Sequence, residues 1–130
     1  MKKERRKDTG SKIKRYKNEY RHAVDGIIYA IEKEWNLLLI MIFILIIFGL
    51  CLLFPVTIPE LLAIVISAGV LMATEMLNTS IEALTDLVTT EENHLAKIAK
   101  DTVSGAVFLF IIMFIFVLGI IFVPKIIELL

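Results

Sequence analysis

The feature that most constrains this chain is an apolar run from Leu37 to Phe54 that contains no charged residue. Its length is about that of a helix crossing the hydrocarbon core of a bilayer. Two more segments of similar character follow at about 61–80 and 105–123. Pro59 lies where the second helix would begin, and proline is tolerated in a helix's first turn. We therefore predict an all-α membrane protein with three transmembrane helices.

The charges divide the chain into two regions. Eleven of the fourteen Lys and Arg residues precede Trp35. A basic arm followed by apolar segments favours contact with anionic lipid headgroups over nucleic acid. We predict a basic, disordered arm at 1–19 and a single membrane-embedded domain at 20–130.

The positive-inside rule predicts an orientation for these helices. The basic arm belongs in the cytoplasm. The connector 55–60 carries no Lys or Arg and is expected outside, whereas 86–104 contains Lys97 and Lys100 and is expected inside. The C-terminus is then outside.

The segment Tyr20–Glu34 shows apolar residues near helical spacing, among them Ala23, Ile27 and Ile31. This pattern predicts an amphipathic helix lying at the cytoplasmic interface. On the pattern alone, a simple anchor is as good an interpretation as a functional element.

A stripe of polar side chains distinguishes the second span. Glu75, Asn78, Glu82 and Asp86 fall in one narrow sector of a helix. An ionisable residue inside a membrane is costly and indicates function. Helix association is the alternative, but it accounts poorly for three like charges.

Carboxylates in this place can bind Mg²⁺ together with substrate phosphates, or accept a proton from a hydroxyl. Glu75 is the deepest and is the candidate base. Lys97, Lys100 and Asp101 follow in the next segment and could offset triphosphate charge, although a solvated helix face is equally possible. The chain has none of the phosphate-binding motifs of soluble kinases.

Two motifs make a family recognisable. They read Glu75-x-x-Asn78-Thr79-x-Ile81-Glu82-x-x-x-Asp86-Leu87 and Leu95-Ala96-Lys97-x-Ala99-Lys100-Asp101-x-x-Ser104-Gly105. The chain from about Tyr20 to the third span closely resembles the prokaryotic diacylglycerol kinase family, in its branch that largely phosphorylates undecaprenol.

This resemblance implies an ATP-dependent lipid kinase in a bacterial cell membrane, assembled as a homotrimer and acting on undecaprenol or diacylglycerol. It implies that Glu75 is the catalytic base and that Glu34 and Glu82 bind Mg²⁺. The residues implied in cofactor binding are Glu34, Asn78, Glu82, Asp86, Glu91, Lys100 and Asp101. Those implied in lipid binding are Gly26, Glu75 and Ser104.

The chain departs from the family pattern in two places. Members of the branch commonly read Glu-Tyr-His-Pro where this chain has Glu91-Glu92-Asn93-His94. Basic residues also often follow the asparagine that corresponds to Asn36, where this chain continues with Leu37-Leu38-Leu39. We expect catalysis to be retained and nucleotide affinity to be altered.

Two other functions remain open on the residues alone. A proton-coupled exporter needs one deep carboxylate such as Glu75, and a non-enzymatic membrane subunit needs only a polar face for helix association. Neither needs the Lys100-Asp101 pair.

Overall fold

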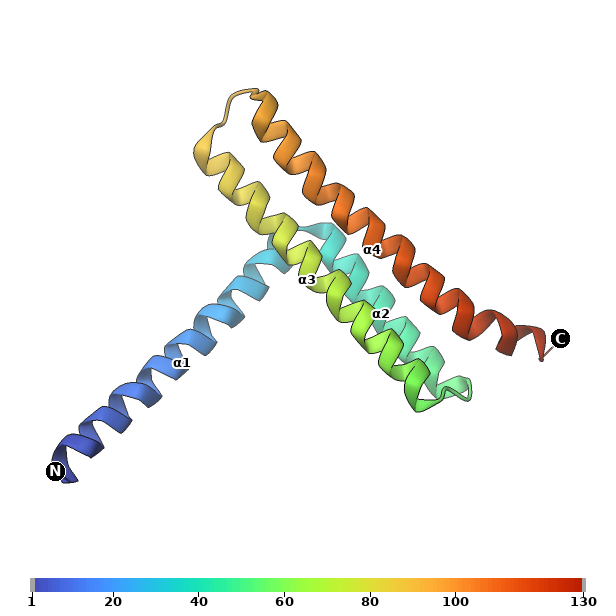
Figure 1. The fold of residues 1–130 in the computed structure, drawn as a ribbon, viewed down its shortest axis with the longest axis horizontal. Coiled ribbons are helices and arrows are strands. Elements are labelled where there is room, and N and C mark those ends of the chain that lie inside the picture. Colours follow the sequence, from blue (N-terminus) through green and yellow to red (C-terminus); the bar gives the residue numbers. More distant parts are fainter. Residues whose placement is uncertain (1, 130) are drawn as a thin grey trace. The chain divides into compact units, whose positions relative to one another are not determined.

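The computed structural model describes residues 2–129, with side chains from residue 15 onward, and contains four helices (Figure 1). Their bounds are α1 Lys2–Lys33, α2 Trp35–Leu53, α3 Ile58–Val88 and α4 His94–Ile127. The chain divides into two compact units, Met1–Lys33 and Glu34–Leu130. The predicted all-helical class is therefore confirmed.

The first unit is helix α1, which covers the segment predicted to be an amphipathic helix except for its last residue, Glu34. Its location at a membrane interface stays a prediction. The same holds for the arm at 1–19, because the side chains of residues 1–14 lie outside the described residues.

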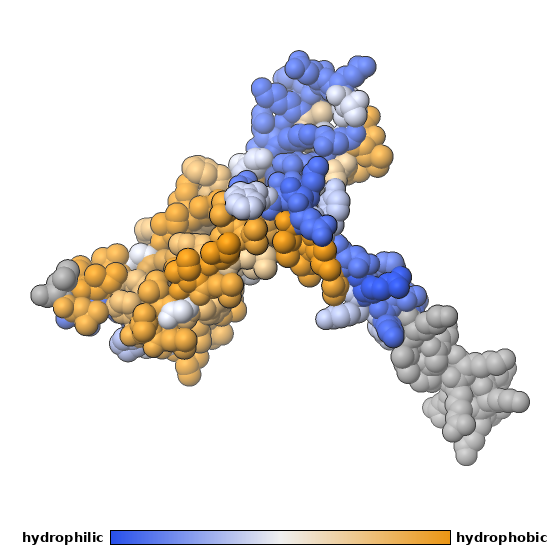
Figure 2. Space-filling view, turned by 180° about the vertical axis from the view of Figure 1, so that it is seen from behind, coloured by the Kyte–Doolittle hydropathy of each residue, from blue (hydrophilic) through white to orange (hydrophobic). Residues whose placement is uncertain are grey.

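Helices α2, α3 and α4 are each long and apolar enough to cross a membrane. Their outer faces carry large apolar side chains, among them Leu45, Leu52 and Phe116, which are all at least two-thirds exposed. Figure 2 shows this unit covered by hydrophobic residues, with hydrophilic residues gathered at the end that carries the α3–α4 loop. A surface of this kind suits a lipid solvent, and the prediction of three helices able to span a membrane is confirmed by length and composition.

Local capping explains where α3 and α4 begin. Thr57 caps α3 in a capping box, in which Glu60 accepts hydrogen bonds from the Thr57 backbone N–H and hydroxyl at 2.7 and 2.8 Å. Pro59 lies in the first turn of α3, as predicted. Asn93 caps α4, where its Oδ1 accepts from the backbone N–H of Leu95 at 2.9 Å. Asn93 is one of the residues at which the chain departs from the family pattern, and its structural role is to cap α4.

Helix α3 packs against both α2 and α4, and side chains of all three helices form a shared apolar core. Ile64 and Leu71 of α3 and Phe114 of α4 are almost completely buried. Phe54, just after α2, meets Phe122 of α4 edge to face, with ring centroids 5.7 Å apart. Such aromatic pairs stabilise by more than the area they bury. The core therefore joins α2, α3 and α4 in one compact unit.

An ion pair closes the end of this bundle farthest from the α3–α4 loop. Helix α4 continues beyond Pro124, where we predicted the third span to stop, and reaches Ile127. This extension brings Lys125 Nζ to 2.9 Å from Glu60 Oε1, and both side chains are largely shielded from solvent. The pair ties the end of α4 to the start of α3.

We predict that Lys125→Met or Glu60→Gln lowers the thermal unfolding temperature of the detergent-solubilised protein. Breaking a shielded pair leaves its partner's charge poorly compensated. The matched control is Arg15→Met, which breaks the exposed Arg15–Glu19 pair of α1 and should have little effect. Equal unfolding temperatures for all three variants and the unchanged protein would show that the pair does not stabilise the bundle.

Candidate functional site

Glu34 is placed by a break in the backbone. It is extended, with φ −114° and ψ 106°, and directly precedes α2 without a side-chain capping hydrogen bond. Its carboxylate is therefore free of the capping role that this position often has. The sequence predicted that the N-terminal helix would continue through Glu34. The structure ends α1 at Lys33, and the Glu34 side chain lines a pocket of the second unit.

The predicted polar stripe lies on α3 as one face. Glu75 is 3 % exposed and Asn78 is 7 % exposed, so both are buried among the three helices. Thr79, also buried, donates its hydroxyl hydrogen bond to the Glu75 carbonyl oxygen at 3.2 Å. Burying a charged group this deep costs free energy unless the group is paired or hydrogen-bonded. Ionisable residues in such places therefore indicate a functional site.

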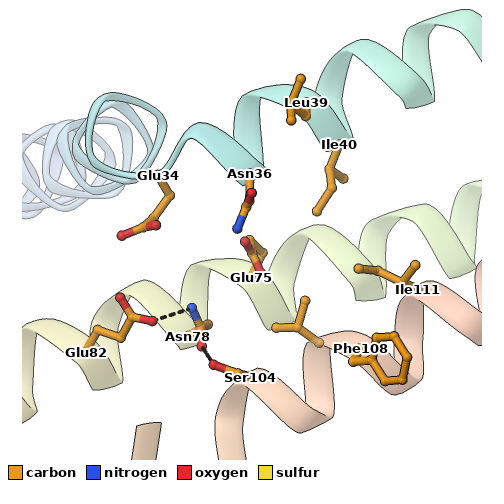
Figure 3. Close-up of a pocket in the computed structure, with 11 residues that line it drawn as sticks. Glu34, Asn36, Leu39, Ile40, Glu75, Asn78, Glu82, Ser104, Phe108 and Ile111 are labelled. Atoms are coloured by element: carbon orange, nitrogen blue, oxygen red, sulfur yellow. Dashed lines mark hydrogen bonds between the residues drawn. The ribbon is translucent and has the colours of Figure 1, made fainter. Parts of the chain in front are cut away.

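The buried part of the stripe opens into a cavity of about 430 Å³ between α2, α3 and α4, called here the carboxylate pocket (Figure 3). It is lined by Glu34, Asn36, Leu39, Ile40, Glu75, Asn78, Glu82, Ser104, Val107, Phe108 and Ile111. Five of the predicted site residues are therefore brought together. Three carboxylates share one cavity whose deeper wall is apolar.

A hydrogen-bonded relay orders one side of the carboxylate pocket. Ser104 of α4 donates its hydroxyl to Asn78 Oδ1 at 3.4 Å, and Asn78 Nδ2 donates to Glu82 Oε1 at 3.1 Å. These bonds appear as dashed lines in Figure 3. The relay couples α4 to α3 and holds the Glu82 carboxylate in one orientation.

The Glu75 carboxylate is differently placed. Among the side chains described, none forms a hydrogen bond or an ion pair with it, yet its oxygen atoms are not sealed from the cavity. In Figure 3 the Asn36 amide of α2 lies across from it. Glu75 can therefore receive a hydrogen bond from a group that enters the pocket.

Asn36 is a pocket residue that the sequence reasoning did not include. The available signal was its place two residues after Glu34, on the polar side of the first span.

The donor set fits a hard cation in part. Glu34 and Glu82 offer carboxylate oxygens, which Mg²⁺ prefers. Within the described residues, however, no group of three or more His, Cys, Asp or Glu side chains converges closely enough to hold a metal ion by itself. Mg²⁺ usually keeps several waters and shares phosphate oxygens with its substrate. The residues present fit that mode of binding and do not form an all-protein cage.

The remaining stripe residue, Asp86, lines a second cavity of about 580 Å³ at the α3–α4 loop, called here the loop pocket. Of the predicted site residues it contains Asp86, Glu91, Lys100 and Asp101. Lys100 Nζ donates to Asp86 Oδ1 at 2.5 Å, and both side chains are partly exposed. The stripe predicted as one feature is thus divided between two pockets, about one helical turn apart on both α3 and α4.

Gly26 lies on α1, in the other compact unit, and its predicted contact with lipid stays a prediction.

Comparisons with known proteins agree with the motifs. The family model described as prokaryotic diacylglycerol kinase matches residues 21–122. A curated protein named undecaprenol kinase, from Bacillus subtilis (strain 168), is 39 % identical over 69 residues. That alignment covers 53 % of this chain and 56 % of the relative, so it spans little more than half of either protein.

Proposed function

The chain belongs to the prokaryotic diacylglycerol kinase family, and from this premise we propose that it transfers the γ-phosphoryl group of ATP to the hydroxyl of a membrane lipid alcohol. We propose undecaprenol as that alcohol, with diacylglycerol as the second candidate. The name of the Bacillus subtilis relative supports the first choice.

The observation that carries the proposal is the buried Glu75 carboxylate facing a cavity within the membrane-spanning unit. A water-soluble alcohol would not be expected to reach a base at this depth in the membrane. A lipid hydroxyl reaches it from within the bilayer. The apolar wall of the pocket, with Leu39, Phe108 and Ile111, suits the first part of a lipid tail.

In the reaction that we propose, Glu75 orients the lipid hydroxyl and accepts its proton. The hydroxyl oxygen forms a bond to the γ-phosphorus. The bond from that phosphorus to the bridging oxygen breaks in line, and ADP leaves with its electron pair. Positioning of the two reactants supplies much of the acceleration in transfers of this kind.

Glu34 and Glu82 would hold Mg²⁺ against the phosphates, and the relay from Ser104 through Asn78 would keep Glu82 in place. Bound Mg²⁺ supplies charge neutralisation on the transferring phosphoryl group. Lys100 and Asp101 of the loop pocket would contact the nucleotide, with Asp86 and Glu91 beside them.

We also propose the assembly and orientation that the family resemblance implies. The chain would form a homotrimer in a bacterial cell membrane, with the α3–α4 loop and both pockets reached from the cytoplasm. The positive-inside pattern supports this orientation.

The test is an assay of ATP consumption by purified protein in detergent micelles containing either undecaprenol or diacylglycerol. A kinase consumes ATP only when a lipid alcohol is present, and the preferred lipid gives the higher kcat/KM. An exporter or a non-enzymatic subunit consumes none with either lipid. That second result would remove the proposal.

Lys100 provides a separate prediction for nucleotide binding. We expect Lys100→Met to raise the KM for ATP about tenfold while the KM for lipid stays unchanged, because one phosphate-facing charge is lost. A comparison variant, Asp86→Asn, breaks the same ion pair but keeps the lysine. Steady-state kinetics that show the same KM for ATP in both variants would indicate that Lys100 acts only through its pair with Asp86.

A further inference from the structure

Asn36 lines the carboxylate pocket, and the proposed reaction gives it no role. It lies in the first turn of α2, two residues after the extended residue Glu34. Its neighbour Leu37 is only 1 % exposed, so this turn is anchored inside the bundle. Side chains on a packed helix are held more precisely than side chains on a loop. The start of α2 therefore fixes the place of Asn36 on the pocket wall.

The Asn36 amide differs from the other hydrogen-bond donors of the pocket because it is free. The Ser104 hydroxyl donates to Asn78 Oδ1 at 3.4 Å, and Asn78 Nδ2 donates to Glu82 Oε1 at 3.1 Å. Within residues 15–129, whose side chains the structure describes, the Asn36 amide has no hydrogen-bond partner. Both of its N–H groups are therefore available to a group inside the pocket.

The group that Asn36 faces is a carboxylate without a donor. Figure 3 shows the Asn36 amide pointing from α2 towards Glu75 on α3. Glu75 is 3 % exposed and has no hydrogen bond or ion pair with a described side chain. Two acceptors that face one another repel, so the amide presents its N–H side to an ionised Glu75. A charge-assisted hydrogen bond from Asn36 would then replace one that the buried carboxylate loses from water.

We propose that Asn36 is a positioning residue for the general base, whose amide donates to one oxygen of the Glu75 carboxylate and leaves the other oxygen for the lipid hydroxyl. This inference rests on the proposed kinase function and adds a residue to it. The terminal torsion of a glutamate is broad, so a carboxylate without this bond samples orientations that do not face the hydroxyl. Asn36 thus acts on the chemical step through Glu75.

The test measures lipid phosphorylation by Asn36→Leu, which has a similar size but no donor. We expect kcat to fall about ten- to a hundredfold, because a hydrogen bond to a charged group is lost. The KM for lipid, the KM for ATP and the dependence on Mg²⁺ should stay unchanged. Asn36→Gln keeps the amide and should restore part of the rate.

The matched control is Trp35→Phe, which alters the same turn of α2. Trp35 is 70 % exposed and does not line the carboxylate pocket. This variant should keep the rate of the unchanged protein. Equal losses in Trp35→Phe and Asn36→Leu would show a general disturbance of the helix start and overturn the inference.

A double variant separates an effect through Glu75 from an independent one. In the Glu75→Gln protein, Asn36→Leu should reduce the residual rate no further, because the group that Asn36 positions no longer accepts a proton. Losses that multiply overturn the inference. A raised KM for lipid with unchanged kcat in Asn36→Leu also overturns it, since Asn36 would then contact the lipid itself.

Side-chain amide NMR provides a readout that does not depend on activity. In detergent-solubilised protein labelled with ¹⁵N-asparagine, the Asn36 signals are those that disappear in Asn36→Leu. Glu75→Gln should shift these signals, because a neutral amide replaces the charged acceptor. Ser80→Ala, at an exposed position of the same helix, should leave them in place. Asn36 signals that do not move in Glu75→Gln overturn the inference.

The two proposals fail in different ways. Absence of phosphorylation of any lipid by the unchanged protein contradicts the kinase function. A normal kcat in Asn36→Leu, with lipid phosphorylated by the unchanged protein, contradicts only the positioning role.

Discussion

Glu75→Gln should reduce lipid phosphorylation by about two to four orders of magnitude, the usual contribution of a general base. The amide has nearly the shape of the carboxylate but cannot accept the hydroxyl proton. Because a neutral amide is cheaper to bury than a carboxylate, the variant should insert and fold at least as well as the unchanged protein. The measurement is the initial rate of phosphorylated lipid formation, together with the thermal unfolding temperature and the elution volume in detergent.

Ser80→Ala is the matched control for this variant. Ser80 lies on the same helix, is exposed, and donates its hydroxyl only to the Met76 carbonyl of its own helix. Its removal should leave the rate within the range of the unchanged protein. A folded Glu75→Gln protein with the normal rate would show that Glu75 is not the base, whatever else the pocket does.

The second large effect is expected at Glu34 and Glu82. Glu34→Gln and Glu82→Gln should each lower kcat by about a hundredfold, because each removes an anionic ligand that would hold the cation against the transferring phosphate. The apparent affinity for Mg²⁺ should fall with it, and a higher Mg²⁺ concentration should restore part of the rate. Titration of the initial rate with Mg²⁺ at saturating ATP measures both effects.

Glu128→Gln serves as the control for these variants, since Glu128 is an exposed carboxylate just after α4, at the opposite end of the bundle from the pocket. The double variant is informative as well. If both carboxylates act on one cation, the combined loss should be smaller than the product of the single losses. A rate reduced with no change in Mg²⁺ dependence would show that the two residues serve the pocket in another way.

Much of this architecture is predictable from the sequence because lipid restricts what a chain can do. An apolar run such as Leu37–Phe54 has few alternatives to a spanning helix, since its backbone polar groups must be satisfied internally. The stripe on α3 is equally predictable, because helical spacing alone aligns Glu75, Asn78 and Glu82. All three line one pocket, which agrees with that alignment.

Other features could not be predicted because they depend on how helices meet. The extended conformation of Glu34 breaks a segment in which neither proline nor glycine signals the end of a helix. Asn36 becomes a pocket residue only because α2 packs across from α3. The division of the stripe into two cavities follows from the positions of Ser104 and Lys100 on α4, which no spacing on α3 reveals.

The end of α4 is another feature that could not be predicted from the sequence alone. Proline usually ends a helix, so Pro124 predicts a stop. The pairing of Lys125 with Glu60, distant in the sequence, accompanies a helix that continues to Ile127. Tertiary contact outweighs local propensity at this position.

Transfer of phosphate to a lipid hydroxyl at Glu75 can be tested directly by one measurement. Purified protein is incubated with ATP labelled at the γ-phosphate and with either a long-chain lipid alcohol or its methyl ether, and the extracted lipid is analysed. We expect label on the alcohol with the unchanged protein, almost none with Glu75→Gln, and none on the methyl ether with either. Unlabelled alcohol in the presence of folded, unchanged protein, or equal labelling by Glu75→Gln, would contradict it.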